Sequence, residues 1–315
     1  MSQNKSLLPY VASIATSFIF GLSFIFSKAA LAITDPITLL SFRFLTAFLI
    51  MSVLVLSGVI KLNYKNKPIL GLVFLAIIEP VLYFIFETYG IKYSSASMAG
   101  LMIALIPILV AILGNYFLKE KPSKIQMFFI ALSVAGVAFI VVMNNSGGKN
   151  TSSIGILILL GAVTCAAVYN IYSRSLSTRF TPMELTYFMM GVGAIFFNFI
   201  SILSHAANGN LNSYFSILQN KNFIIAILYL GILSSIIAFY LTNFALSKIE
   251  ASRSAVFSNL STIVSIIGGV IFLKEHFYFY HIIGSIMILL GVWGTNHFRI
   301  SNKSTKITKE HFINY

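Results

Sequence analysis

Two carboxylates inside one apolar run are the residues of this chain best suited to chemistry. Glu79 and Glu87 lie within residues 69–90, where most other side chains are apolar. A carboxylate in such a run is costly unless it faces the protein interior or a water-filled cavity. There it would compensate a cationic or amine-bearing solute, carry a proton, or pair with a structural partner such as Arg43 or a nearby hydroxyl.

Tyr83 is expected to share a helix face with both carboxylates. Steps of four and eight residues turn a helix face by about 40° and 80°, so Glu79, Tyr83 and Glu87 form one polar stripe about 12 Å long. Glu79 falls near the middle of its apolar run and Glu87 nearer one end. We therefore predict that these three residues bind substrate.

The composition indicates the kind of element that holds these residues. Of 315 residues, 58% are hydrophobic and 9% are charged, against about 25% charged in a soluble domain. Spans of about 20 apolar residues are long enough to cross a bilayer. The sequence predicts an all-α membrane protein with ten transmembrane helices, at about 9–33, 36–60, 69–90, 97–118, 125–143, 154–173, 183–203, 223–246, 252–273 and 279–298.

Charge between the spans predicts the topology. Of the 21 Lys and Arg residues, 15 fall on the side of the two termini, 5 on the other side and one, Arg43, within the second span. The excess of Lys and Arg predicts that both termini are cytoplasmic in a plasma or inner membrane. The first run is longer than a signal-peptide core, so a cleavable signal is not expected. Two links, 144–153 and 204–222, are long enough to be mobile.

The chain has an internal repeat. An offset of 155 residues aligns Phe117–Glu120 with Phe272–Glu275 and Gly136 with Gly291, and an offset of 146 aligns Lys28 with Arg174. Five spans per repeat is an odd number, so the halves, 1–143 and 154–298, should have inverted orientations, with 299–315 as a cytoplasmic tail. Inverted repeats are typical of secondary transporters that work by alternating access.

Several short motifs, taken in order, resemble the drug/metabolite transporter superfamily and its EamA-type ten-helix members. They are the run from Phe20 to Phe24 followed by Lys28, Arg43-Phe44, and Ala96–Pro107 with Leu118 and Glu120. The chain departs from the family pattern at Phe20, where many members have Trp, and at Thr262, where the pattern has Pro. The resemblance implies a central site lined by the first, third, fourth, sixth, eighth and ninth helices.

Further site residues follow from that implication. Tyr169 and Asn170 in the sixth span, and Tyr240 and Asn243 in the eighth, would offer stacking and oriented hydrogen bonds to an amphipathic solute. The alternative is that they join helices by hydrogen bonds. Arg43 either reaches the interface, pairs with a carboxylate or has another structural role. Pro80 and Pro107 are expected to kink their helices.

Two classes of function are consistent with these residues. The first is a secondary transporter, not an enzyme, that exports small metabolites such as amino acids or related amines, with or without proton coupling, or that expels organic cations. The second is a membrane sensor or enzyme that binds a small ligand in the same cavity. No phosphate-binding loop or metal-ligand spacing is present, so no metal or other cofactor is expected. The expected partners are a small solute, lipids and, with coupling, protons. Nucleic acid is not expected despite a net charge of +13, and the chain is expected to be a monomer or a homodimer.

Overall fold

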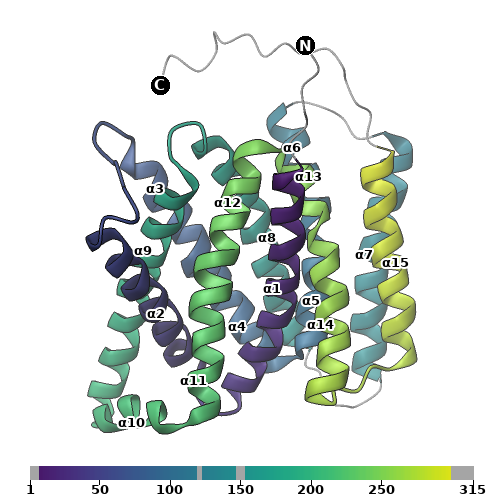
Figure 1. Ribbon diagram of the computed structural model, residues 1–315. Helices are drawn as coiled ribbons and strands as arrows, with labels where there is room; N and C mark the ends of the chain where they lie inside the picture. The colour runs from purple at the N-terminus through teal and green to yellow at the C-terminus, as the bar shows by residue number, and fades with distance from the viewer. Residues whose placement is uncertain (1–6, 119–122, 147–152, 299–315) are drawn as a thin grey trace.

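The structure is a computed structural model that describes residues 7–118, 123–146 and 153–298 (Figure 1). Over those residues it consists of helices and links, without a strand. In chain order the helices are α1 (Leu8–Leu31), α2 (Pro36–Leu56), α3 (Ile69–Ala76), η1 (Ile77–Leu82), α4 (Tyr83–Tyr93), α5 (Ala96–Ile103), α6 (Ile106–Leu118), α7 (Lys124–Ser146), α8 (Ser153–Leu176), α9 (Pro182–Ala207), α10 (Leu211–Ser216), η2 (Ile217–Gln219), α11 (Lys221–Leu228), η3 (Tyr229–Ala238), α12 (Phe239–Lys248), α13 (Ala251–Val256), α14 (Ser258–Leu273) and α15 (Phe279–His297).

Eight helical segments within the described residues are long and apolar enough to cross a membrane. The remaining two predicted spans lie within α7 and α15, at the apolar stretches Lys124–Ile140 and Phe279–Gly294. The all-helical prediction is confirmed, whereas the number of crossings established by length is eight.

Two predicted spans are broken at their prolines. Glu79 has an extended backbone (φ −148°, ψ 114°) inside η1, which is the conformation that a following proline favours. The fourth span is divided into α5 and α6, and Pro107 lies in the first turn of α6. The eighth span contains a second π-helical segment, η3. The single smooth helix predicted for Glu79, Tyr83 and Glu87 is therefore wrong at Glu79.

Polar side chains fix the starts of α2 and α9. Asp35 caps α2 by accepting hydrogen bonds from the backbone N–H groups of Ile37 and Thr38. Thr181 and Glu184 form a capping box at α9, in which each satisfies a backbone donor of the other. Glu184 also accepts a hydrogen bond from the backbone N–H of Asn63 at 2.9 Å and pairs with Lys67 at 2.6 Å. This carboxylate therefore ties the link between α2 and α3 to α9.

The helices pack as a central bundle with a peripheral pair. In the bundle α1 packs against α14 and α12, α4 against α8, α5 against α14, and α2 against α9. The pair α7 and α15 stands at one side (Figure 1). Its helices approach closely at Gly136 and Gly284, where an added Cβ at Gly136 would lie 2.9 Å from the Gly284 carbonyl oxygen. Close packing through small residues is common between helices in membranes.

The link 204–222 is structured, contrary to the prediction of a mobile loop. It contains α10 and the short helix η2. Tyr214 is buried and stacks on Phe42 with ring centres 4.7 Å apart. Its hydroxyl donates to Asn198 Oδ1 at 2.8 Å. Tyr214 thus anchors the link, with its ring against α2 and its hydroxyl against α9. The other predicted loop, 144–153, lies mostly outside the described residues, which resume at 153.

Candidate functional site

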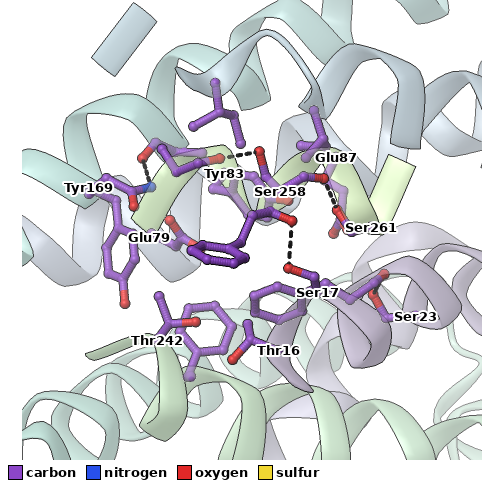
Figure 2. A pocket seen from close by; sticks show the side chains of 18 of the residues that line it. Thr16, Ser17, Ser23, Glu79, Tyr83, Glu87, Tyr169, Thr242, Ser258 and Ser261 are labelled. Atoms are coloured by element: carbon purple, nitrogen blue, oxygen red, sulfur yellow. Dashed lines mark hydrogen bonds between the residues drawn. The ribbon is translucent and has the colours of Figure 1, made fainter. Parts of the chain in front are cut away.

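A cavity of about 100 Å³ lies in the central bundle, and the helices that line it are α1, α2, η1, α4, α5, α6, α8, α12, α13 and α14. Figure 2 shows carboxylates, hydroxyls and aromatic rings around it. The predicted site residues that line it are Glu79, Tyr83, Glu87, Tyr169 and Asn170. Together with the other lining residues, side chains from seven of the predicted spans surround one space, so the fold brings together residues far apart in sequence.

The two carboxylates are buried in the wall of this cavity. Glu79 is 5% exposed and Glu87 is 2% exposed. The Oε2 atom of each is buried without a hydrogen-bond partner in the described structure. Buried polar atoms nearly always have a partner, and an unsatisfied one is costly in a low dielectric. Each carboxyl group is therefore able to receive a donor from a ligand or to hold a proton.

Arg43 supplies the cation of the cavity wall. Its side chain is 1% exposed, so the expectation that it reaches the interface is wrong. Nε donates to Ser235 Oγ at 2.9 Å and Nη2 to Ser234 Oγ at 2.8 Å, both within η3. The guanidinium carbon lies 4.2 Å from the centre of the Phe84 ring, a cation–π distance. In the described structure no ion pair of 4.0 Å or less joins Arg43 to either carboxylate.

Hydroxyl groups make much of the remaining wall, and they act mainly as acceptors toward the cavity. Ser23 Oγ donates to the Phe20 carbonyl oxygen at 2.7 Å, and Ser17 Oγ donates to that of Phe257 at the same distance. A hydroxyl that donates its proton to a backbone carbonyl oxygen still has lone pairs that can accept a hydrogen bond from a solute. The lining residues whose hydroxyls donate to backbone carbonyls are Ser13, Thr16, Ser17, Ser23, Thr242, Ser258 and Ser261.

Sequence reasoning missed these hydroxyls, although α1 carried a signal for them. Residues 13, 16, 17, 20 and 24 all line the cavity. They follow the spacing i, i+3, i+4, i+7 and i+11, which marks one face of a helix. On that face small polar residues at 13, 16 and 17 are followed by phenylalanine at 20 and 24, and the three hydroxyls distinguish it from a face that contacts lipid.

Phenylalanine rings form the apolar part of the wall. Phe20 meets Phe239 edge to face with ring centres 5.5 Å apart, and Phe84 lies 5.9 Å from Phe239. Phe24 and Phe257 complete this lining. Apolar walls with a few oriented polar groups are typical of sites that bind small organic molecules. Phe20, one of the two departures from the family pattern, thus lies where a solute would touch it.

Two of the predicted site residues, Tyr240 and Asn243, lie outside the cavity lining. Asn243 is buried, and its Oδ1 accepts hydrogen bonds from Tyr169 at 2.8 Å and Ser173 at 2.7 Å. Its Nδ2 donates to Thr186 Oγ1 at 3.1 Å. Asn243 thereby joins α12 to α8 and α9, which matches the alternative role of holding helices together. Tyr240 stacks on Phe244 of its own helix.

No metal centre is found in the described residues, since no three of their His, Cys, Asp and Glu side chains form a group that could hold an ion. Cys165 is a buried free thiol. The wall instead combines two carboxyl groups, one guanidinium, hydroxyl acceptors and aromatic rings. This arrangement is suited to reversible binding of a small solute that carries N–H donors and an apolar part.

Comparison with known proteins gives one family over most of the chain. The model of the EamA-like transporter family matches twice, at residues 7–142 and 153–296. The chain is 40% identical over 296 residues to the uncharacterized transporter YcxC of Bacillus subtilis, covering 94% of this chain and 95% of that protein. It is 24% identical to a probable terminal-alkyne amino-acid exporter of Streptantibioticus cattleyicolor, over 61% of each chain. A solved structure described only as the crystal structure of a protein has the same fold, with a TM-score of 0.63 at 17% identity, over 96% of this chain and 100% of that one.

Proposed function

The chain belongs to the EamA-like transporter family, and from this premise we propose that it is a secondary active transporter that exports small metabolites by alternating access. Its many apolar helices make it a multi-pass membrane protein. The observation that carries the proposal is the central cavity, which is walled by helices of both matched segments and contains two carboxyl oxygens without partners. Transporter sites commonly lie between two repeats and near broken helices.

We propose ten crossings in two inverted five-helix repeats, 1–143 and 154–298. Support comes from contacts that recur at the repeat offsets. Lys28 donates to the Ile91 carbonyl oxygen at 2.8 Å, and Arg174 donates to that of Leu246 at 2.7 Å; Lys28 plus 146 is Arg174, and Ile91 plus 155 is Leu246. In the 155-residue register Glu79 corresponds to Ser234, and both lie in π-helical segments.

We further propose that the solute is an amine, with amino acids and related amines as the first class to test and organic cations as the alternative. The wall offers many hydrogen-bond acceptors. They are the carboxyl oxygens and the oxygens of hydroxyls whose protons are already donated to backbone carbonyls. Such a wall suits an ammonium group, which has only donors. Arg43 supplies a counter-charge for a carboxylate on the solute. The name of the relative from Streptantibioticus cattleyicolor, a probable amino-acid exporter, is consistent with this class.

Proton coupling is the second part of the proposal. The unpartnered oxygen of Glu79 is satisfied either by a proton or by an N–H of the solute, so the two compete for one atom. Competition of this kind would link solute release to proton uptake. In proteoliposomes, Glu79→Gln should still exchange labelled solute but should no longer accumulate it when a pH difference is imposed. Normal pH-driven accumulation by this variant would eliminate the proton role.

For orientation, we propose a plasma or inner membrane location with cytoplasmic termini, because of the charge asymmetry between the links.

Flux measurement tests the main proposal. Purified protein is first screened by thermal shift against amino acids, nucleobases and organic cations, and each hit is then tested for exchange across proteoliposomes, with protein-free liposomes as control. We expect exchange of at least one amine. A ligand that stabilises the protein but never crosses the membrane would favour a sensor, and conversion of the ligand would favour an enzyme.

A further inference from the structure

A cluster of polar contacts closes the end of the bundle beyond the cavity. The cavity lining begins near the start of α1, at Ser13, and reaches Phe24, while on α14 it extends only to Ser261. Figure 1 shows α1 and α14 continuing beyond this region toward the lower end of the view. The charged groups in that direction are Lys28, at the end of α1, and Glu275, just after α14.

Glu275 is held in place by the way in which α14 ends. Lys274 adopts the left-handed conformation (φ 53°) at the C-terminus of the helix. The backbone N–H of Glu275 then donates to the Gly269 carbonyl oxygen at 3.1 Å, as in a helix-terminating turn. The side chain is thereby directed at the first turn of α5, in the other half of the chain.

The carboxylate of Glu275 binds the N-terminus of α5 with both oxygens. Oε1 accepts a hydrogen bond from the Ala96 N–H at 2.7 Å, and Oε2 accepts one from the Ser97 N–H at 2.9 Å. The first N–H groups of a helix have no partner within the helix and attract negative charge. This is a two-point, charge-assisted contact between the halves.

Lys28 holds the same turn from the other side. Its Nζ donates to the carbonyl oxygens of Ile91 at 2.8 Å and Ser94 at 2.7 Å. These oxygens lie at the end of α4, where cations are favoured. Lys28 belongs to the same half as this turn, so it orders the turn, whereas Glu275 is the group that joins the halves.

Gly269 provides the space for this contact. A Cβ atom at position 269 would fall against the Ser97 hydroxyl and the Glu275 carboxylate. Helices α5 and α14 can therefore approach each other here only because residue 269 has no side chain. A methyl group would displace the carboxylate without altering its charge.

We propose that Glu275 is a gate residue whose carboxylate latches α14 to α5 and must leave the Ala96 and Ser97 N–H groups before the cavity opens at this end. The proposal rests on alternating access, the proposed function above. A gate role differs from a purely structural role in one measurable respect. Loss of a gate exposes the cavity from one face of the membrane only.

Thiol labelling tests the latch without any substrate. In a Cys165→Ser background, Ser23→Cys places one cysteine on the cavity wall, at a side chain that is 1% exposed. A membrane-impermeant thiol reagent is added to right-side-out and to inside-out vesicles. A separate Lys274→Cys variant, at an exposed position, identifies which vesicles present the Glu275 face.

We expect Glu275→Gln to raise the labelling rate of Ser23→Cys from the Glu275 face by about fivefold or more, the scale of losing one charge-assisted hydrogen bond. Gly269→Ala should do the same while retaining the carboxylate, which covers the case of a Gln variant that folds poorly. Lys274→Gln, the matched control, should leave labelling unchanged.

Unchanged labelling in both test variants, or an equal increase from both faces, would overturn the proposal. Because labelling requires no solute, the labelling result can contradict the latch without contradicting the transport function, and the flux result can do the reverse. A protein that shows gated labelling but no flux for any amine would retain the latch and lose the proposed function.

Discussion

Arg43 in α2 donates a hydrogen bond to Ser234 in η3 at 2.8 Å, so the cation of the cavity wall is attached to the π-helical segment of the other half. Its second bond, to Ser235, comes from a different nitrogen of the guanidinium. The two bonds fix the plane of the group, and Phe84 covers it at 4.2 Å. Arg43 can thus contribute charge to a bound solute while remaining part of the packing between halves.

Replacing Arg43 with lysine should lower both stability and transport. Lysine keeps the charge but lacks the planar fork that reaches two hydroxyls, and loss of charged hydrogen bonds costs about 1.5–3 kcal/mol. The measurement is the midpoint of thermal unfolding in detergent, together with flux.

The control for this effect is a double-mutant cycle. Ser235→Ala alone should lower the midpoint less than Arg43→Lys, and the double variant should fall short of the sum, because the two residues share one contact. Additive effects would show that the Arg43–Ser235 bond does not stabilise the protein.

Glu79→Gln should reduce transport at least tenfold while the protein still folds. The amide keeps the size of the side chain but removes its charge, and about 1.4 kcal/mol of lost differential binding gives that factor. An amide is also less costly than a charge in low dielectric. Flux in proteoliposomes and the unfolding midpoint measure the two effects.

Comparison with Glu87 and with aspartate sharpens this test. Glu87→Gln should have the smaller effect if only Glu79 contacts the solute, and Glu79→Asp should retain part of the activity. Normal exchange with unaltered solute affinity in Glu79→Gln would leave Glu79 as a structural residue.

Glu184 should matter more for stability than its partner Lys67. The carboxylate accepts hydrogen bonds from the backbone of Thr181 and of Asn63 as well as from Lys67, so Glu184→Gln weakens a helix cap and a loop anchor together. We expect a loss of about 1–2 kcal/mol, measured as a lower unfolding midpoint. Lys67→Gln, which removes one partly exposed ion pair, should cost less than about 1 kcal/mol. Equal losses would assign the effect to the ion pair alone.

Topology can be tested with two matched serines. In a Cys165→Ser background, Ser57→Cys and Ser213→Cys each replace an exposed serine in a link between helices or in α10. The Lys and Arg excess places Ser57 with the termini in the cytoplasm and Ser213 outside. An impermeant thiol reagent should therefore label Ser213→Cys in intact cells and spare Ser57→Cys. The reverse pattern would show the opposite orientation, and labelling of both would show a dual one.

The sequence by itself determined the helical membrane class and the location of the polar groups within it. Apolar length and the rarity of charge suffice for this, because hydrocarbon tolerates few alternatives to a helix whose backbone is fully hydrogen-bonded. The same reasoning identified Glu79, Tyr83 and Glu87, since a carboxylate in an apolar run is conspicuous. Pro80 marked the helix break, because the effect of proline on its predecessor is local.

Tertiary structure alone decided which polar residues face the cavity and which join helices. Asn243 and Asn170 are both amides within apolar spans. Asn243 is hydrogen-bonded to Tyr169, Ser173 and Thr186, whereas Asn170 lines the cavity. Arg43 is bound by serines 191 and 192 residues away, and Glu275 meets α5 across 178 and 179 residues. No local pattern encodes such pairings, because they depend on how whole helices are rotated and shifted against one another when their small residues pack.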